Sequence, residues 1–141
     1  MALESIKVSA LLPATPERVY KVWLSSKDHS AFTGATARVS SRAGARFSAW
    51  DGYIQGRNLE LEPYRRIVQA WRTTDFPADS SDSRLEVLLE PATGGTRVTL
   101  VHADIPEGQS PEYRQGWIDY YLKPMKKYLG AERQSKRRRA P

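Results

Sequence analysis

The sequence predicts an α+β fold in which a curved antiparallel sheet of six to seven strands wraps around a long C-terminal helix. Three observations predict it. Strand-like, aromatic-rich segments separated by turns fill most of the chain between residues 35 and 103. Before them, the sequence shows the pattern of one strand and then the patterns of two short helices. After them, a helical stretch carries the other large apolar surface, and a one-sided sheet needs such a surface to cover it.

The N-terminal elements are marked by their end signals. Residues 3–12 alternate weakly between apolar and polar side chains, which predicts the first strand. Thr15, Pro16 and Glu17 supply an N-cap, a proline at the first helical position and an acid in the first turn, so a helix is predicted over residues 16–24. A second short helix is predicted over residues 25–32 and closed by Gly34.

The middle of the chain is a run of strands. They are predicted at residues 35–40, 45–50, 53–62, 66–72, 84–90 and 96–103. Asp51-Gly52 accepts the positive φ angles of a two-residue hairpin, and a second turn contains Pro63. Residues 77–83 form a polar loop, and residues 91–95 form the last hairpin turn.

The last helix begins with a second cap, proline and acid signature, Ser110-Pro111-Glu112, and is predicted to reach about Leu129. Its apolar stripe contains Tyr113, Trp117, Tyr120, Tyr121, Pro124 and Tyr128. Because Pro124 removes a backbone hydrogen bond, a bend is expected near Tyr120. The alternation of the strands turns three rows toward this helix: Ile67, Gln69 and Trp71; Leu85, Val87 and Leu89; Val98, Leu100 and His102.

Composition limits the class of protein. A chain of 141 residues holds one core, expected within residues 1–131, and the formal charge of +6 is concentrated in residues 132–141, which carry a net +4. That segment is expected to be a disordered basic tail, and no nucleic-acid partner is expected. No apolar run of membrane-spanning length and no signal peptide are visible, so a cytoplasmic protein without a membrane partner is expected. With no cysteine and two distant histidines, neither a metal site nor a cofactor is expected.

Four motifs carry a family resemblance. They read F-x-x-W-D-G-x-I-x-G-x-N-x-E-L-x-P from Phe47, R-I-V-Q-x-W-R from Arg66, G-G-T-x-V-x-L-x-H from Gly94 and G-W-x-x-Y-Y-L-K-P-M-K from Gly116. This series resembles the C-terminal domain of the activator of the heat-shock-protein-90 ATPase, a domain of the START-like, helix-grip (Bet v-like) superfamily. The resemblance implies the helix-grip fold. Because that superfamily includes lipid-binding proteins, receptors, cyclases and co-chaperones, the fold alone does not set the activity.

Seven residues are predicted to line a mainly apolar cavity between the sheet and the last helix: Trp23, Phe47, Trp71, Leu100, His102, Trp117 and Tyr121. The function predicted from them is non-catalytic binding of a small hydrophobic molecule, with His102 as its hydrogen-bond partner. The same aromatic residues are also typical of an ordinary filled core.

Two alternatives stay open at this point. The resemblance implies a co-chaperone of the stress response that binds heat shock protein 90 and stimulates its ATPase. An enzyme of unknown reaction would use the same cavity, with Asp104 orienting His102. No nucleophile is signalled, so no catalytic residue is predicted, and the sequence does not indicate an oligomeric state.

Overall fold

The computed structural model of the protein describes residues 2–139 and has the predicted α+β architecture. One antiparallel sheet has the strand order β1-β6-β5-β4-β3-β2. Its strands are β1 (Glu4–Leu12), β2 (Arg46–Ala49), β3 (Ile54–Glu62), β4 (Arg66–Thr73), β5 (Ser83–Ala92) and β6 (Gly95–Ile105). The helices are α1 (Pro16–Trp23), α2 (Ser26–Thr33), α3 (Ser110–Trp117) and α4 (Lys123–Arg139), with a π-turn, η2 (Ile118–Leu122), between the last two.

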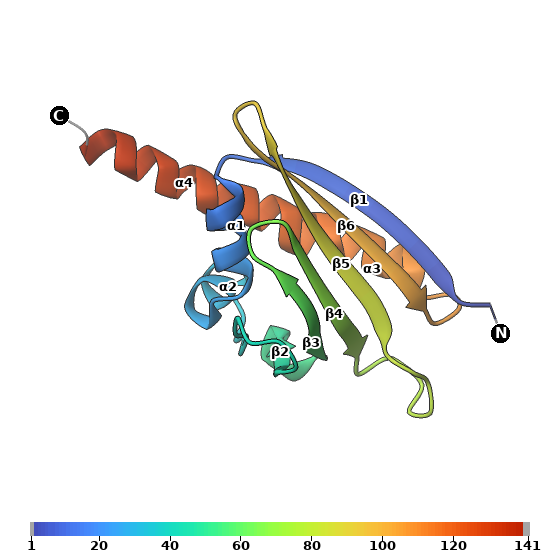
Figure 1. Cartoon of the computed structure of the whole chain (residues 1–141). Helices are drawn as coiled ribbons and strands as arrows, with labels where there is room; N and C mark the ends of the chain where they lie inside the picture. The colour runs from blue at the N-terminus through green and yellow to red at the C-terminus, as the bar shows by residue number, and fades with distance from the viewer. Residues whose placement is uncertain (1, 140–141) are drawn as a thin grey trace.

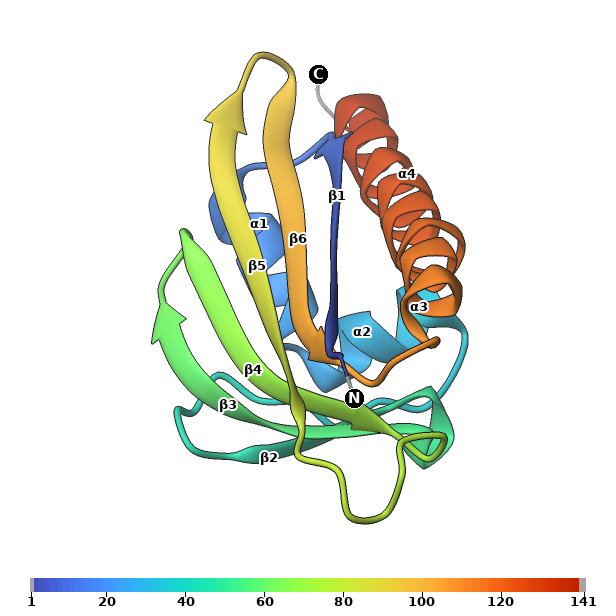
Figure 2. The ribbon, with the colours of Figure 1, turned by 90° about the vertical axis from the view of Figure 1, so that its right-hand side faces the viewer.

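The sheet is strongly curved. In Figure 2, β1 and β6 stand upright while β2 and β3 lie across the bottom of the view, and α3 and α4 run beside β1. Figure 1 shows α4 continuing past the end of the sheet toward the C-terminus. The inner face of the sheet carries the three rows that the alternation predicts, since Gln69, Val87 and His102 are all buried.

The two short helices match the predicted ranges to within one residue at each end. The Thr15 hydroxyl accepts a hydrogen bond from the Arg18 amide at 3.2 Å, and the Ser25 hydroxyl accepts one from the Asp28 amide at 3.2 Å. Gly34 closes α2 in the left-handed conformation, with φ of 77°. These ends depend on residues within one turn of each other, so the local sequence determines them.

The strand predicted at residues 35–40 is absent, which gives the sheet six strands. That segment makes only an isolated bridge between Arg38 and Ser48. The Asn58 side chain from β3 explains the irregular path, because its amide donates to the carbonyls of Ser40 (2.9 Å) and Arg42 (3.0 Å) and so holds the chain away from strand pairing. Local alternation does not reveal such a long-range contact.

The connection between β2 and β3 is longer than the predicted two-residue hairpin. The strands separate after the Ala49–Ile54 pair, which leaves four residues in the loop. Asp51 and Gly52 have positive φ as predicted, but Trp50 does too, at 52°. Asp51 stabilises this arrangement, because its carboxylate accepts a hydrogen bond from the Thr36 amide at 2.9 Å. Trp50 therefore leaves the strand and lies at the edge of the sheet. The β5–β6 turn, by contrast, is shorter than the predicted residues 91–95, because the two strands pair as far as Ala92 and Gly95.

The C-terminal helix is irregular where Pro124 predicts. The π-turn contains Tyr120, whose carbonyl the missing Pro124 amide would have met in an α-helix, and the Lys123 amide bonds to the Ile118 carbonyl five residues earlier. Ser110 is the first helical residue rather than the cap, which is Gln109, and the Ser110 amide donates to the Glu4 carboxylate at 3.1 Å.

The predicted end at Leu129 is wrong, since α4 continues to Arg139. Gly130 costs only about 1 kcal/mol in a helix, and the residues after it are good helix formers. Glu132 also pairs with Arg18 of α1 at 3.1 Å, and Arg133 donates to the Gly94 carbonyl at 3.1 Å. The segment expected to be a disordered tail is therefore helical as far as residue 139, and residues 140–141 lie outside the described part. The domain boundary at residue 131 stays a prediction.

Candidate functional site

The space between the sheet and the C-terminal helix is filled by aromatic rings. The Trp71 ring lies 4.6 Å from His102 and 5.4 Å from Trp117, measured between centroids. Tyr121 lies 4.8 Å from Trp117 and 5.2 Å from Trp23. All five residues are buried. The structure thus brings together five of the seven predicted site residues, as a packed cluster.

The other two predicted residues belong to the same buried core but not to this set of ring contacts. Leu100 is fully buried in β6 between Val8 and Val87 of the neighbouring strands. Phe47 of β2 packs over Gly56, where a Cβ atom would lie 2.6 Å from two ring carbons of Phe47. The volume that Gly56 leaves open is therefore occupied by the Phe47 ring. The bulge in β3 lies further on, between residues 58 and 60.

A hollow does exist beside the aromatic cluster, as a surface cleft of about 390 Å³. It lies between β3, β4 and the α3–η2 part of the last helix. Its lining residues are Trp50, Tyr53, Ile54, Trp71, Tyr113, Gly116, Trp117, Tyr120 and Tyr121. Three of them were predicted site residues, namely Trp71, Trp117 and Tyr121. Seven of the nine carry aromatic rings, so the cleft is chiefly apolar.

Much of this lining could have been found in the sequence. Tyr113 and Tyr120 belong to the apolar stripe of the last helix, and Gly116 lies three residues after Tyr113 and four before Tyr120, on the same side of the helix. A Cβ atom on Gly116 would meet nothing closer than Tyr120 Cδ2 at 3.8 Å. Trp50 and Tyr53 flank Asp51-Gly52, but only the folded loop shows that both reach the cleft.

Several polar atoms of the lining are directed to protein partners. The Tyr53 hydroxyl donates to Asp75 at 2.7 Å, and the Tyr113 hydroxyl lies 2.6 Å from that of Thr73. Trp117 Nε1 donates to His102 Nδ1 at 3.1 Å. What these residues present to the cleft is therefore mostly ring surface.

Comparison with known proteins identifies the family. Residues 13–130 match the family model described as "Activator of Hsp90 ATPase homolog 1-like protein". The chain belongs to this family. This confirms the family resemblance.

Curated members of the Hsp90-ATPase-activator family match the same region. The "Activator of 90 kDa heat shock protein ATPase homolog 1" of Homo sapiens is 28% identical over 116 residues, which are 82% of this chain and 34% of that protein. The corresponding homologue of Dictyostelium discoideum is 27% identical over 117 residues, 81% of this chain and 30% of its own. The chain thus spans about a third of the length of these relatives.

Solved structures support the helix-grip fold. An HSP90 activator from Plasmodium falciparum superposes with a TM-score of 0.81 at 22% identity, covering 89% of this chain and 96% of that one. A protein from Chromobacterium violaceum gives 0.71 at 26% identity, with the same coverage of both chains. At 22% identity the first of these shows the fold alone.

His102 is a satisfied interior histidine in this family member. Its Nδ1 accepts from Trp117, so Nε2 carries the proton and donates to the Ser83 hydroxyl at 2.8 Å. Ser83 in turn donates to the Trp71 carbonyl at 2.6 Å. Burial lowers the pKa of His102 to about 3, which keeps the ring neutral. Asp104 is exposed, and in residues 2–139 it makes no hydrogen bond to His102.

A second buried histidine was not among the predicted residues. His29 Nδ1 lies 2.8 Å from the Trp23 carbonyl and its Nε2 lies 2.9 Å from the Tyr121 hydroxyl. Nδ1 must donate to the carbonyl, so Nε2 accepts from Tyr121. Burial lowers the pKa of His29 to about 4. Its three-residue spacing from Phe32 on α2 is the signal that could have placed it inside.

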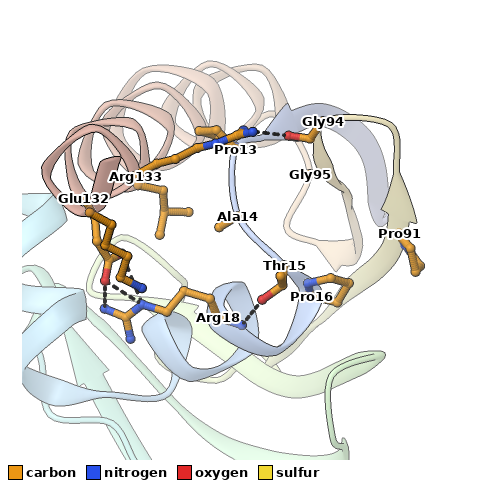
Figure 3. A pocket seen from close by; sticks show the side chains of 12 residues that line it. Pro13, Ala14, Thr15, Pro16, Arg18, Pro91, Gly94, Gly95, Glu132 and Arg133 are labelled. Carbon is orange, nitrogen blue, oxygen red and sulfur yellow. Dashed lines mark hydrogen bonds and ion pairs between the residues drawn. The ribbon is translucent and has the colours of Figure 1, made fainter. Parts of the chain in front are cut away.

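Another hollow, of about 510 Å³, lies further along the last helix, beside the C-terminal half of α4, and is shown in Figure 3. It is enclosed by the start of α1, the β5–β6 turn and α4. The Arg18–Glu132 pair and the contact from Arg133 to Gly94 bridge its rim. These contacts hold α4 to α1 and to the β5–β6 turn. Because the three charged groups that make them are already paired, they are not free to bind a ligand in this hollow.

Residues 2–139 contain no group of three histidine, cysteine, aspartate or glutamate side chains placed to hold a metal ion. Within the same range, every helix is too short or too polar to cross a membrane.

Proposed function

We propose that this family member is a non-catalytic binding protein that holds a small apolar molecule in the aromatic cleft. The observation that carries the proposal is the cleft's lining of seven aromatic side chains around about 390 Å³. That volume lies within the range of small-molecule sites, which are commonly lined by apolar and aromatic side chains.

The interior His102 does not fit the role of polar handle, because both of its ring nitrogens have protein partners. We expect a ligand's polar end at the rim, beside Tyr120, which is 59% exposed. The same saturation of His102, with its lowered pKa, supports a non-catalytic role. Location in the cytoplasm stays a prediction.

A second candidate function is contact with a chaperone of the heat-shock-protein-90 class and stimulation of its ATPase. The curated relatives bear that activity in their names. The exposed rim of the cleft also favours a chaperone contact. Tyr120 stands edge-on to Trp50 at 5.5 Å, and a partner protein could place an apolar side chain against these two rings. In this case the cleft would receive a side chain of the chaperone.

One set of variants tests both candidates. Gly116→Phe would fill the cleft from an open helical position, and Gly116→Ala is its matched control because it adds a single methyl group. Leu100→Trp is unsuitable, since Leu100 is fully buried and the change would disrupt the core. Binding of the hydrophobic dye anilinonaphthalene sulfonate is measured by fluorescence, and native mass spectrometry of the purified protein detects a retained molecule.

The ligand proposal expects dye binding by the parent and by Gly116→Ala, and a loss of at least tenfold in affinity in Gly116→Phe. Equal binding by both variants, or none by the parent, would refute it. The chaperone candidate is measured on the same proteins as stimulated ATPase activity. Stimulation that is lost in Gly116→Phe places the contact at the cleft, whereas stimulation that is unchanged places it elsewhere.

A further inference from the structure

Four arginines gather on the outer face of the sheet, on the side away from the aromatic cleft. Arg38, Arg46, Arg57 and Arg72 line a concavity of about 380 Å³ over β2, β3 and β4. Its remaining lining is formed by Phe47, Ser48, Gln55, Gly56 and Asp82. With four guanidinium groups and one carboxylate, the lining carries a formal charge of +3.

The strand register brings these positive charges together. Arg46 of β2 stands directly opposite Arg57 of β3. In the next row, Ser48 pairs with Gln55 and Gln55 pairs with Arg72, while Arg38 bridges to Ser48. Like charges placed directly opposite in an antiparallel pair lower the stability of a sheet. The Arg46–Arg57 pair is therefore expected to lower the free energy of unfolding.

Among the described residues, only one of these four arginines has its charge compensated by an ion pair. Arg72 binds Asp82 at 2.9 Å, and Arg57 donates only to the Gly44 carbonyl, at 2.9 Å. Within residues 2–139, Arg38, Arg46 and Arg57 have no carboxylate within 4.0 Å.

Arg66, at the other end of β4 on the same face, is fully paired. Arg66 contacts three carboxylates, those of Glu60, Glu62 and Glu86. Arg66 at the start of β4 is thus neutralised by carboxylates, whereas the concavity near the end of β4 leaves three guanidinium groups without a carboxylate within residues 2–139.

From this contrast we infer that the arginine concavity binds an acidic segment of a partner protein. Guanidinium groups receive carboxylates through paired hydrogen bonds, and a bound carboxylate between Arg46 and Arg57 removes their repulsion. A short segment fits better than a long polyanion, because a nucleic acid extended along β3 would meet Glu60 and Glu62. The inference does not depend on the aromatic cleft.

The test uses a fluorescein-labelled peptide of six glutamates and measures its binding by fluorescence anisotropy at low salt. The variant is the double substitution Arg38→Gln and Arg46→Gln, since neither side chain makes a hydrogen bond or ion pair within the described residues. The matched control is Arg97→Gln with Arg114→Gln, which removes the same charge from exposed positions on β6 and α3. Gly116→Phe separates this site from the cleft.

We expect the double variant at residues 38 and 46 to weaken peptide binding at least tenfold, and the control variant and Gly116→Phe to stay within twofold of the parent. The urea midpoint of the double variant should equal or exceed that of the parent, because a repulsion is removed. A lower midpoint would make these arginines structural and overturn the inference. Equal loss in the control variant would overturn it too, as would tighter, arginine-dependent binding of single-stranded RNA or of phosphatidylserine vesicles.

Discussion

Replacing Gly56 by alanine tests how closely β2, β3 and β4 pack. A Cβ atom at this position would lie 1.9 Å from the Ala70 carbonyl oxygen and 2.6 Å from two ring carbons of Phe47. The ring can rotate away, but Ala70 belongs to β4 and pairs with Arg57, so its carbonyl moves only if the two strands separate. Overpacking typically costs about 1–3 kcal/mol. Because a backbone atom is the nearest neighbour, we expect the upper end of that range.

Urea unfolding measures this cost. With a slope near 1.5 kcal/mol per molar, a loss of about 3 kcal/mol lowers the urea midpoint by about 2 M. Gly116→Ala is the matched control, since the nearest atom to its Cβ is Tyr120 Cδ2 at 3.8 Å. In a helix this change should raise stability by up to about 1 kcal/mol. The same substitution is thus expected to have opposite signs at the two glycines.

A midpoint for Gly56→Ala that stays within 0.3 M of the parent, on the order of 0.5 kcal/mol, would refute the close approach of β3 to β4. A decrease for both variants would show instead that Gly116 also packs tightly, and would remove the free volume assigned to the cleft.

Two further predictions concern the interior. Trp71→Ala and Trp117→Ala should each cost about 3–5 kcal/mol, because both rings are buried in one cluster; unchanged urea midpoints would show that the inner rows are misassigned. Stability should also fall with acidity, since the pKa values of His29 and His102 are lowered to about 4 and about 3 in the folded protein, against about 6.5 unfolded. The unfolded chain binds more protons, so the full contribution is present above pH 6.5 and falls by about 1.4 kcal/mol per pH unit for each imidazole toward pH 4. Urea midpoints at pH 7.5 and 5.5 check this: His102→Gln should halve the slope, and a flat profile would contradict it.

The sequence predicts those parts of the fold that depend on near neighbours. Thr15 and Ser25 act on amides three residues away, and Gly34 is needed only for its own φ angle. The inner rows of β5 and β6 follow equally from alternation, because one face of each strand is clearly apolar.

The incorrect predictions depend on contacts that sequence distance hides. Residues 35–40 look like a strand until Asn58, about twenty positions later, takes the carbonyls of Ser40 and Arg42. Gly130 predicts a helix end at Leu129, whereas Arg18 of α1 forms an ion pair with Glu132, about one turn beyond that residue.

In the candidate site, too, the sequence predicts which residues take part but not how distant segments pack together. The sequence identifies the aromatic residues of the sheet and the helix, but counting rings does not distinguish a hollow from a packed cluster. Phe47 fills the space above Gly56, while Gly116 faces open volume, although both positions are glycines beside aromatic residues. That difference depends on the relative placement of β2 and α3.

Two hydrogen-bond relays explain why the cleft is apolar although its walls contain tryptophan and tyrosine. Trp117 donates to His102, and Tyr121 donates to His29, so the polar edges of both rings point into the interior. Each histidine is neutral and passes a hydrogen bond on, to Ser83 or to the Trp23 carbonyl. Since an imidazole with one donor and one acceptor satisfies both neighbours at once, no polar edge is left to face the cleft from these two rings. In the proposed ligand site, the buried histidines would therefore act only by orienting these two rings, and a ligand would meet the rings' faces.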